Sequence, residues 1–354
     1  TRDRGEPVDQ AALDARVRTV TAEIVRQQIE SGIDVVNDGE VSKVGYSTYV
    51  KERLTGFDGE GRLPRIGDMR DFPEFVRRFL SQRAIAELAT PACTGPVKWK
   101  DKSAVQKDVA NFKAALQGVK PADTFLSAAS PGVISLFLQN QYYPSHEAYL
   151  SALADVMKVE YTAIYKAGFL LQLDCPDLAM GRHIQFVDAT LEEFRKMIAL
   201  HVEALNHAVA GIPPERMRLH LCWGNYEGPH HLDVPIQDIL DIVLKARPAG
   251  LSFEAANPRH EHEWQVFKKF KQQLANKVLI PGVLDSCTNY IEHPELVAER
   301  LVKFAKIVGK ENVIAGTDCG FATFVGLLTV DPQITWAKFQ AMAEGARLAS
   351  EQLW

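Results

Sequence analysis

The chain has 354 residues, of which 46% are hydrophobic and 24% charged, and its formal net charge at pH 7 is -5. This composition is typical of a folded globular protein with a large core. A negative charge with dispersed Lys and Arg argues against nucleic-acid binding. No apolar run reaches the length of a membrane span, residues 1–6 lack the pattern of a signal peptide, and five widely spaced cysteines do not form a secreted disulfide framework. We therefore expect a cytoplasmic protein whose partners are small molecules.

The first elements of the chain are a helix and a short strand. Apolar residues recur at helical spacing from 9 to 31, and Gly32 supplies a stop. The β-branched run 33–37 predicts a strand that leads into the polar segment Asp38-Gly39-Glu40. Polar residues that could form a site therefore follow the carboxyl end of this strand.

Residues 41–102 differ from the rest, because up to Pro96 they mix aromatic residues with Gly and Pro and show no sustained period. We interpret them as an insertion that forms a lid or an oligomer contact. A homo-oligomer is therefore one possible assembly. Residues 98–101 are the candidate return of a hairpin.

Strands and helices then alternate regularly to the end of the chain, which predicts a parallel sheet with crossover helices. The predicted helices include 103–117, 145–167, 190–209 and 294–308, and the strands after 33–37 are 124–129, 169–174, 217–222, 250–254, 278–284 and 312–316. Seven strands fall one short of a closed (β/α)8 barrel. The eighth could precede Thr1, which we favour, or lie near Val97. We expect residues 1–354 to form one catalytic α/β TIM-barrel domain with an insertion after its second strand.

The strongest chemical signal is His220 and Cys222, which are two residues apart on one predicted strand and so point to the same face. Glu254 and Cys319 lie at the exits of two other strands, and strand exits form the active face of a barrel. Zinc favours this mixture of nitrogen, oxygen and sulfur ligands. We therefore predict one zinc site formed by His220, Cys222, Glu254 and Cys319.

Other polar residues at strand exits have a plainer explanation. Asp38, Asp285 and Asp318 could each cap a helix or hold a loop. The histidines in the loops after these strands could contact substrate, but solvated loop residues are the simpler interpretation; they are His230, His231, His260 and His262.

Six segments resemble, in order and spacing, the C-terminal catalytic domain of the cobalamin-independent methionine synthase family. They are Asp38-Gly39-Glu40, Leu171-Gln172-Leu173-Asp174, His220-Leu221-Cys222, Glu254, Gly282-Val283-Leu284-Asp285 and Asp318-Cys319-Gly320. The resemblance covers nearly the whole chain and implies a barrel of the methionine synthase/uroporphyrinogen decarboxylase-like type. It also implies that zinc on His220, Cys222, Glu254 and Cys319 activates a substrate thiol.

The same resemblance implies roles for three carboxylates and a pair of substrates. Glu40 and Asp174 would bind the amino group of homocysteine, and Asp285 would be catalytic. The methyl donor would be methyltetrahydrofolate or, as in some short relatives, a methylcorrinoid. The chain departs from the family where Cys175 and Cys287 stand in place of a glutamate and a histidine.

Three alternatives remain open at this point. A related alkyl or epoxide transferase would use coenzyme M, whose sulfonate Glu40 and Asp174 would repel unless Lys43 or Arg182 neutralises them. A zinc lyase or hydrolase would use activated water. A structural zinc in a binding barrel would need four protein ligands and no open position.

Overall fold

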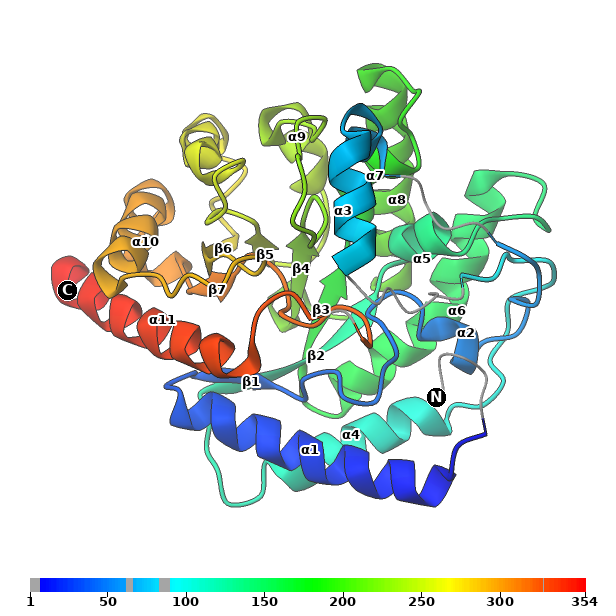
Figure 1. Ribbon diagram of the computed structural model, residues 1–354, viewed down its shortest axis with the longest axis horizontal. Helices are drawn as coiled ribbons and strands as arrows, with labels where there is room; N and C mark the ends of the chain where they lie inside the picture. The colour runs from blue at the N-terminus through cyan, green and yellow to red at the C-terminus, as the bar shows by residue number, and fades with distance from the viewer. Residues whose placement is uncertain (1–6, 62–65, 83–89, 327) are drawn as a thin grey trace.

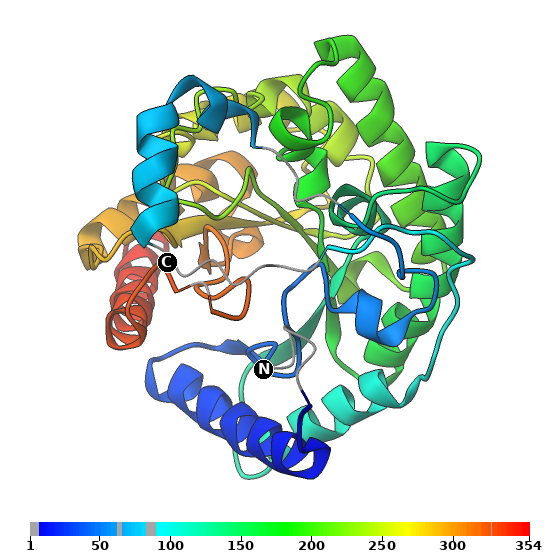
Figure 2. The same cartoon turned by 45° about the vertical axis from the view of Figure 1, so that its right-hand side comes forward.

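A curled sheet of seven parallel strands forms the centre of the molecule. The computed structural model describes residues 7–61, 66–82, 90–326 and 328–354. Each strand pairs with the next one along the chain, so the spatial order is the sequence order, and the helices lie outside the curl (Figure 1, Figure 2). The strands are β1 (Val35–Asn37), β2 (Asp123–Ala129), β3 (Leu170–Asp174), β4 (Met217–Leu221), β5 (Gly250–Phe253), β6 (Val278–Leu284) and β7 (Gly316–Thr317).

The long helices follow the predicted pattern. The first begins after Asp9, whose side chain accepts hydrogen bonds from the backbone N–H groups of Ala11 and Ala12. In the part of the chain that the structure describes, no helix is both long and apolar enough to cross a membrane. The α-helices are α1 (Gln10–Glu30), α2 (Val50–Arg53), α3 (Pro73–Gln82), α4 (Ser103–Ala115), α5 (Pro131–Phe137), α6 (His146–Lys166), α7 (Gly181–Ile184), α8 (Leu191–Ala208), α9 (Leu240–Val243), α10 (Pro294–Val308) and α11 (Pro332–Leu353). The 3₁₀ helices are η2 (Gly67–Asp71), η3 (Pro176–Leu178), η4 (Pro214–Arg216), η5 (Ile236–Asp238), η6 (Glu261–Phe270) and η7 (Lys310–Asn312).

The predicted insertion, residues 41–102, contains α2, η2 and α3 between β1 and α4. Residues 98–101 return as predicted, because Trp99 forms an antiparallel bridge with Leu54. The described residues near Val97 are not part of the barrel sheet, so they do not supply an eighth strand. Arg53 holds α2 to the barrel helices through buried ion pairs with Asp108 (2.5 Å) and Glu160 (3.2 Å).

The last strand is shorter and later than predicted. We expected residues 312–316, but β7 contains only Gly316 and Thr317, and Val313 makes an isolated bridge to Leu279. Val313 and Gly316 keep one register on β6, opposite Leu279 and Gly282, but the two residues between them form no ladder. The register then shifts, so that Thr317 pairs with Leu284.

The insertion and the loop after β7 meet at the open side of the sheet. Among the described residues, β1 and β7 do not pair with each other. Instead Gly45 forms an antiparallel bridge with Phe324, the Tyr46 N–H donates to the Thr323 carbonyl (3.2 Å), and the Val325 N–H donates to the Val44 carbonyl (3.0 Å). Both segments follow the carboxyl ends of their strands, so this pairing lies on the face where barrel sites form.

Candidate active site

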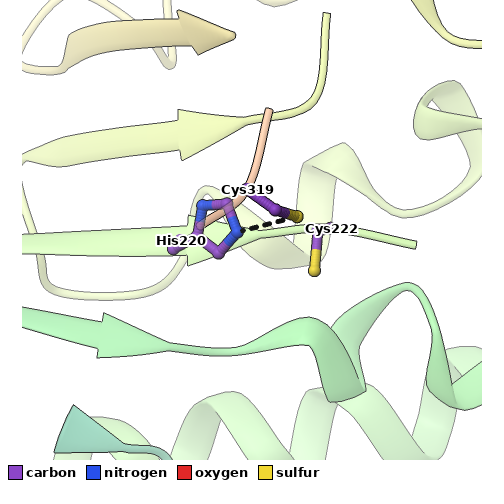
Figure 3. Close-up of side chains that lie close together, drawn as sticks. All are labelled: His220, Cys222 and Cys319. Carbon is purple, nitrogen blue, oxygen red and sulfur yellow. Dashed lines mark hydrogen bonds between the residues drawn. The ribbon is translucent and has the colours of Figure 1, made fainter. Parts of the chain in front are cut away.

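Three of the predicted ligands form a compact cluster, which we call the sulfur cluster: His220, Cys222 and Cys319. One ligand atom from each lies within 4.8 Å of the others. The His220 Nε2 atom is 3.5 Å from the Cys319 Sγ atom (Figure 3). His220 lies on β4, Cys222 directly follows it, and Cys319 reaches in from the loop after β7. The structure therefore brings together residues that are 99 positions apart in the sequence.

Strand geometry and one buried carboxylate place these ligands. The alternation of β4 turns Leu219 and Leu221 into the core, so His220 and Cys222 share the opposite face. The Asp318 carboxylate accepts hydrogen bonds from the backbone N–H groups of residues 255–257. Asp318 thus fixes the loop after β5 against the loop that carries Cys319. It is a loop-holding residue, one of the two structural roles we considered for it.

Glu254 borders the sulfur cluster without joining it. Its Oε1 atom is 3.8 Å from the Cys319 Sγ atom, but it is not one of the three residues whose ligand atoms lie within 4.8 Å of one another. Oε1 also accepts from the Trp223 N–H (2.8 Å), and Oε2 accepts from the Asn257 side-chain amide (2.7 Å). Burial and the nearby Asp318 raise the pKa of Glu254 to about 7. Its role as a fourth ligand stays a prediction.

The donor set suits a zinc ion. The His220 Nδ1 atom contacts the Ser252 hydroxyl at 3.2 Å, an outer contact that leaves Nε2 for a metal. Burial and Arg218 lower the pKa of His220 to about 4, so its imidazole is neutral at pH 7. The hydrogen bond with Cys222, burial and nearby charge raise the pKa of Cys319 well above its ordinary value. A metal would therefore release thiol protons as it binds, which is usual for sites of two thiolates and an imidazole.

The sulfur cluster forms part of the wall of a cavity of about 660 Å³. Glu40, Lys43, Asp174 and Arg218 line the same cavity. The cluster is thus accessible to a small molecule, and the cavity offers that molecule two acidic and two basic side chains.

The acidic side chain of Glu40 is already paired. Lys43 Nζ lies 2.9 Å from Glu40 Oε2 and also donates to the Ser127 carbonyl (2.6 Å). Glu40 has a left-handed backbone with φ of 52°, which is uncommon for a residue other than glycine. Arg182, the other basic neighbour considered from the sequence, donates instead to the carbonyl of Phe186. Lys43 therefore neutralises one of the two predicted amine-binding carboxylates.

Asp174 and Arg218 lie on adjacent strands beside the sulfur cluster. Asp174 pairs in register with His220 and accepts a hydrogen bond from the Gln172 amide (2.9 Å). Burial, then the charge of Glu40, raises the pKa of Asp174 to about 7. Arg218 stacks over Phe125 at 4.1 Å, and its Nε atom has no hydrogen-bond partner among the residues described. Arg218 was not among the residues predicted from the sequence. Its position on β4, two residues before His220, places its side chain on the same face of the sheet as His220.

An aromatic wall completes the cavity. Tyr46 from the insertion, Phe137 from α5 and Phe324 from the loop after β7 lie with ring centroids 5.3 to 5.9 Å apart. All three line the cavity, so apolar surface faces the charged side.

Asp285 does not line this cavity. One carboxylate oxygen accepts from the Cys287 N–H (2.8 Å) and the other from the Thr288 hydroxyl (2.7 Å). In this geometry Asp285 orders its own loop, a role that its position after a strand also allowed. Its catalytic role stays a prediction.

The loop histidines differ from one another. His262 is exposed, in line with the simpler sequence interpretation. That interpretation is wrong for His260, which is 3% exposed and stacks on Trp223 with ring centroids 3.8 Å apart. His260 is buried because two buried carboxylates bind its ring: Glu263 lies 2.8 Å from Nδ1 and Asp233 lies 2.9 Å from Nε2.

Fold and site together define a barrel-type α/β protein whose strand ends carry a cluster of thiols and an imidazole beside a cavity. No family model matches the chain. Curated methionine synthases of Thermococcus kodakarensis and Sulfolobus acidocaldarius are each 24% identical to it. The matches cover 95% of this chain and 84% of the first relative, and 99% and 87% for the second.

A solved structure agrees with the fold. The B12-independent methionine synthase of Shewanella sp. W3-18-1, in complex with selenomethionine, matches with a TM-score of 0.74 at 20% identity, over 98% of this chain and 91% of that one. The barrel-type fold predicted from the sequence is confirmed. The predicted resemblance to the methionine synthase family is confirmed as well, over nearly the whole chain.

Proposed function

We propose that the protein is a zinc-dependent methyltransferase that methylates the thiol of homocysteine and forms methionine. The observation that carries this proposal is the position of the sulfur cluster in the wall of a cavity with paired acidic and basic side chains. Similarity to curated methionine synthases supports it.

The chain's own residues supply a metal site with room for a substrate. His220, Cys222 and Cys319 would hold zinc, with Glu254 as the predicted fourth ligand. Bound zinc would lower the pKa of a coordinated substrate thiol, which is near 8.5 in free cysteine, and keep it as a nucleophilic thiolate. All three residues of the sulfur cluster line the cavity, which favours this role over a purely structural zinc.

The charges around the cavity suit an amino acid that carries both an ammonium and a carboxylate group. Asp174, with Glu40 in its ion pair with Lys43 beside it, would bind the ammonium group, while Arg218 would bind the carboxylate. Two acids and two bases leave the cavity near neutral, so a zwitterion would enter without a large charge penalty. Homocysteine is such a zwitterion with a thiol.

The insertion and the aromatic wall would serve the methyl donor. We assign residues 41–102 to the single barrel domain as a lid, because Val44, Tyr46 and Lys43 line the cavity. Tyr46, Phe137 and Phe324 would exclude water and offer apolar surface to a planar donor such as methyltetrahydrofolate or a methylcorrinoid.

One observation favours a second candidate, transfer of an alkyl group to coenzyme M. Lys43 pairs with Glu40, which weakens repulsion of a sulfonate, and Arg218 lies beside the sulfur cluster. Asp174 opposes this candidate, because a carboxylate faces the same space. The choice depends on which thiol binds more tightly.

Cobalt-substituted protein tests both candidates. We expect homocysteine to produce a new thiolate-to-cobalt absorption band, and the Asp174→Asn variant to need a higher homocysteine concentration for the same band. Methionine should then form from homocysteine and one of the two methyl donors. Tighter binding of coenzyme M would transfer the assignment to the second candidate, and the absence of a band with either thiol would favour a zinc hydrolase or lyase.

A further inference from the structure

A second group of potential metal ligands lies beneath the insertion, apart from the sulfur cluster. Asp68 comes from η2, His183 from α7, and His230 and Asp233 from the loop after β4. Ligand atoms of Asp68, His230 and Asp233 lie within 4.8 Å of one another. We call Asp68, His183, His230 and Asp233 the carboxylate–imidazole cluster.

His183 is buried without the hydrogen bonds that a buried imidazole requires. It is 1% exposed, and among the described residues neither of its ring nitrogens has a hydrogen-bond partner. The Oδ1 atoms of Asp68 and Asp233 are buried and lack partners in the same described set. A buried polar atom without a partner costs about 1 to 3 kcal/mol, so native proteins rarely keep several of them together. A bound ion would satisfy one His183 ring nitrogen and the two carboxylate oxygens at once.

The spacing of these atoms fits two ligands of one ion. His183 Nδ1 lies 3.2 Å from Asp233 Oδ1, yet the two do not form a hydrogen bond. Two ligands bound to one tetrahedral zinc at about 2.0 to 2.1 Å are separated by roughly 3.3 Å. The pair therefore has the spacing of metal ligands.

Each carboxylate keeps one oxygen for an ion and uses the other to hold its orientation. The Asp68 Oδ2 atom accepts from the Tyr226 hydroxyl (2.8 Å) and the His230 backbone N–H (2.7 Å). The Asp233 Oδ2 atom is 2.9 Å from ring nitrogens of His230 and His260. Outer hydrogen bonds of this kind orient metal-binding carboxylates in known sites.

The charge of the region also calls for a cation. Three buried carboxylates gather here, those of Asp68, Asp233 and Glu263. His230 and His260 each have both ring nitrogens against acceptor oxygens, including those of Asp233 and Glu263. Buried charge that is not offset is costly, so the region favours an additional cation.

We propose that Asp68, His183 and Asp233 bind a second divalent cation of the zinc class, with His230 alongside. Two carboxylate oxygens and one imidazole nitrogen suit such an ion better than magnesium or calcium, which take oxygen ligands only. The ion joins η2 of the insertion to α7 and to the loop after β4. Ile66 and Met69, which flank η2's Asp68, line the cavity, so the ion fixes one wall of the substrate cavity.

The close packing of η2 on α7 supports this role. A Cβ atom on Gly67 would lie 2.8 Å from the His183 carbonyl oxygen, so only glycine allows this approach next to Asp68. The insertion is thus held against the helix that carries His183.

The test uses the full-length Cys222→Ser/Cys319→Ser protein, in which the sulfur cluster no longer competes for metal. After dialysis against Zn²⁺, we expect about one retained zinc per chain by elemental analysis. Asp68→Asn or His183→Gln in this background should weaken zinc binding at least tenfold. Asp68→Asn retains an oxygen for the Tyr226 and His230 donors, so its fold is expected to persist. His231→Gln is the matched control, because His231 pairs with Asp71 in the same region.

Two further readouts separate an ion site from a purely structural network. Zinc should raise the melting temperature of the Cys222→Ser/Cys319→Ser protein and not that of its Asp68→Asn derivative, since only a folded-state site gains from added ligand. Cobalt bound there should show no sulfur-to-cobalt band. Failure of the double-serine protein to retain zinc, or retention unaffected by Asp68→Asn and His183→Gln, would overturn the proposal. Neither result depends on methyl transfer, so the proposed function is tested separately.

Discussion

The sulfur cluster and the carboxylate–imidazole cluster both depend on the exit of β4, but they are built differently. The first takes its residues from the ends of strands and borders an open cavity. The second takes them from a 3₁₀ helix, a four-residue helix and a loop, and lies beneath the insertion. Strand ends hold the ligands of the sulfur cluster where a substrate can reach them. The ligands of the carboxylate–imidazole cluster lie on short helices and a loop, which come together only when the insertion packs against the barrel.

Trp223 connects the two clusters. Its backbone N–H donates to Glu254 beside Cys319 (2.8 Å), and its ring stacks on His260, which contacts Asp233. Each region also contains a residue with a left-handed backbone, Glu40 in the cavity wall and His230 within the carboxylate–imidazole cluster, both with φ of 52°. Such strain costs of order 1 to 3 kcal/mol and persists where the surroundings enforce it. The two clusters are therefore neighbours with separate chemistry.

The largest expected effect is the loss of the sulfur cluster. We expect Cys319→Ser to lose the zinc held at this site and to reduce methyl transfer to the background level, because ligand loss weakens both affinity and thiol activation. Cys93→Ser is the matched control, since Cys93 is also fully buried but lies outside the cavity. Elemental analysis and turnover would measure both effects. Full activity in Cys319→Ser would show that the cluster is not the reaction centre.

The buried cluster should reveal itself in the pH dependence of stability. Hydrogen bonds to Asp233 and Glu263 outweigh the opposing effect of burial and raise the pKa of His260 from 6.5 to about 9. Because the folded-state pKa is the higher one, the stabilisation is complete below pH 6.5 and is lost as the pH rises through about 9. A shift of this size corresponds to on the order of 3 kcal/mol.

Urea unfolding of chelator-treated protein between pH 6 and 9.5 would measure this contribution. Relative to His260→Gln, the wild-type protein should lose on the order of 3 kcal/mol of unfolding free energy across that range. His262→Gln, an exposed histidine on the same 3₁₀ helix, should follow the wild type. Parallel pH profiles for wild type and His260→Gln would contradict the expected protonation of His260.

Binding of the substrate carboxylate is the next test. We expect Arg218→Gln to raise KM for homocysteine by roughly tenfold to a hundredfold, since a hydrogen bond to a charged group contributes about 1.5 to 3 kcal/mol. The effect on kcat should be smaller, because Arg218 would bind the substrate and not the transferring methyl group. Arg216→Gln, which removes a more exposed arginine bound to Gly168, is the control. An unchanged KM in Arg218→Gln would remove this residue from the proposed substrate site.

The sequence allowed a good prediction of the sulfur cluster because its chemistry follows strand periodicity. His220 and Cys222 are two residues apart, and Cys319 follows a strand that parallel topology places at the same edge. Glu254 was placed at the correct strand end, but its hydrogen bonds to Trp223 and Asn257 depend on tertiary contacts. The sequence pattern does not contain those contacts.

The carboxylate–imidazole cluster and the end of the sheet were less predictable for a related reason. Asp68 lies in an insertion without a period, and His183 lies on a four-residue helix, so neither has a spacing that points to the other. The end of the sheet likewise departs from its pattern, because only Gly316 of the predicted strand 312–316 belongs to β7 and the register on β6 shifts directly after it. Local patterns predicted the regular elements, while contacts between irregular segments required the folded structure.

The smallest expected effect concerns the outer contact of the sulfur cluster. The Ser252 hydroxyl lies 3.2 Å from His220 Nδ1, and this contact favours the tautomer that leaves Nε2 for zinc. Ser252→Ala should therefore lower zinc affinity about tenfold, at the lower end of the range for such contacts, while the protein still binds one zinc at the cluster at saturation. Competition with a chelator would measure the change. Ser135→Ala is the control, because Ser135 is similarly buried and its hydroxyl donates to the Gly132 carbonyl of its own helix. If both variants hold zinc as tightly as the wild type, His220 does not depend on Ser252 for its orientation, and strand geometry alone orients its imidazole.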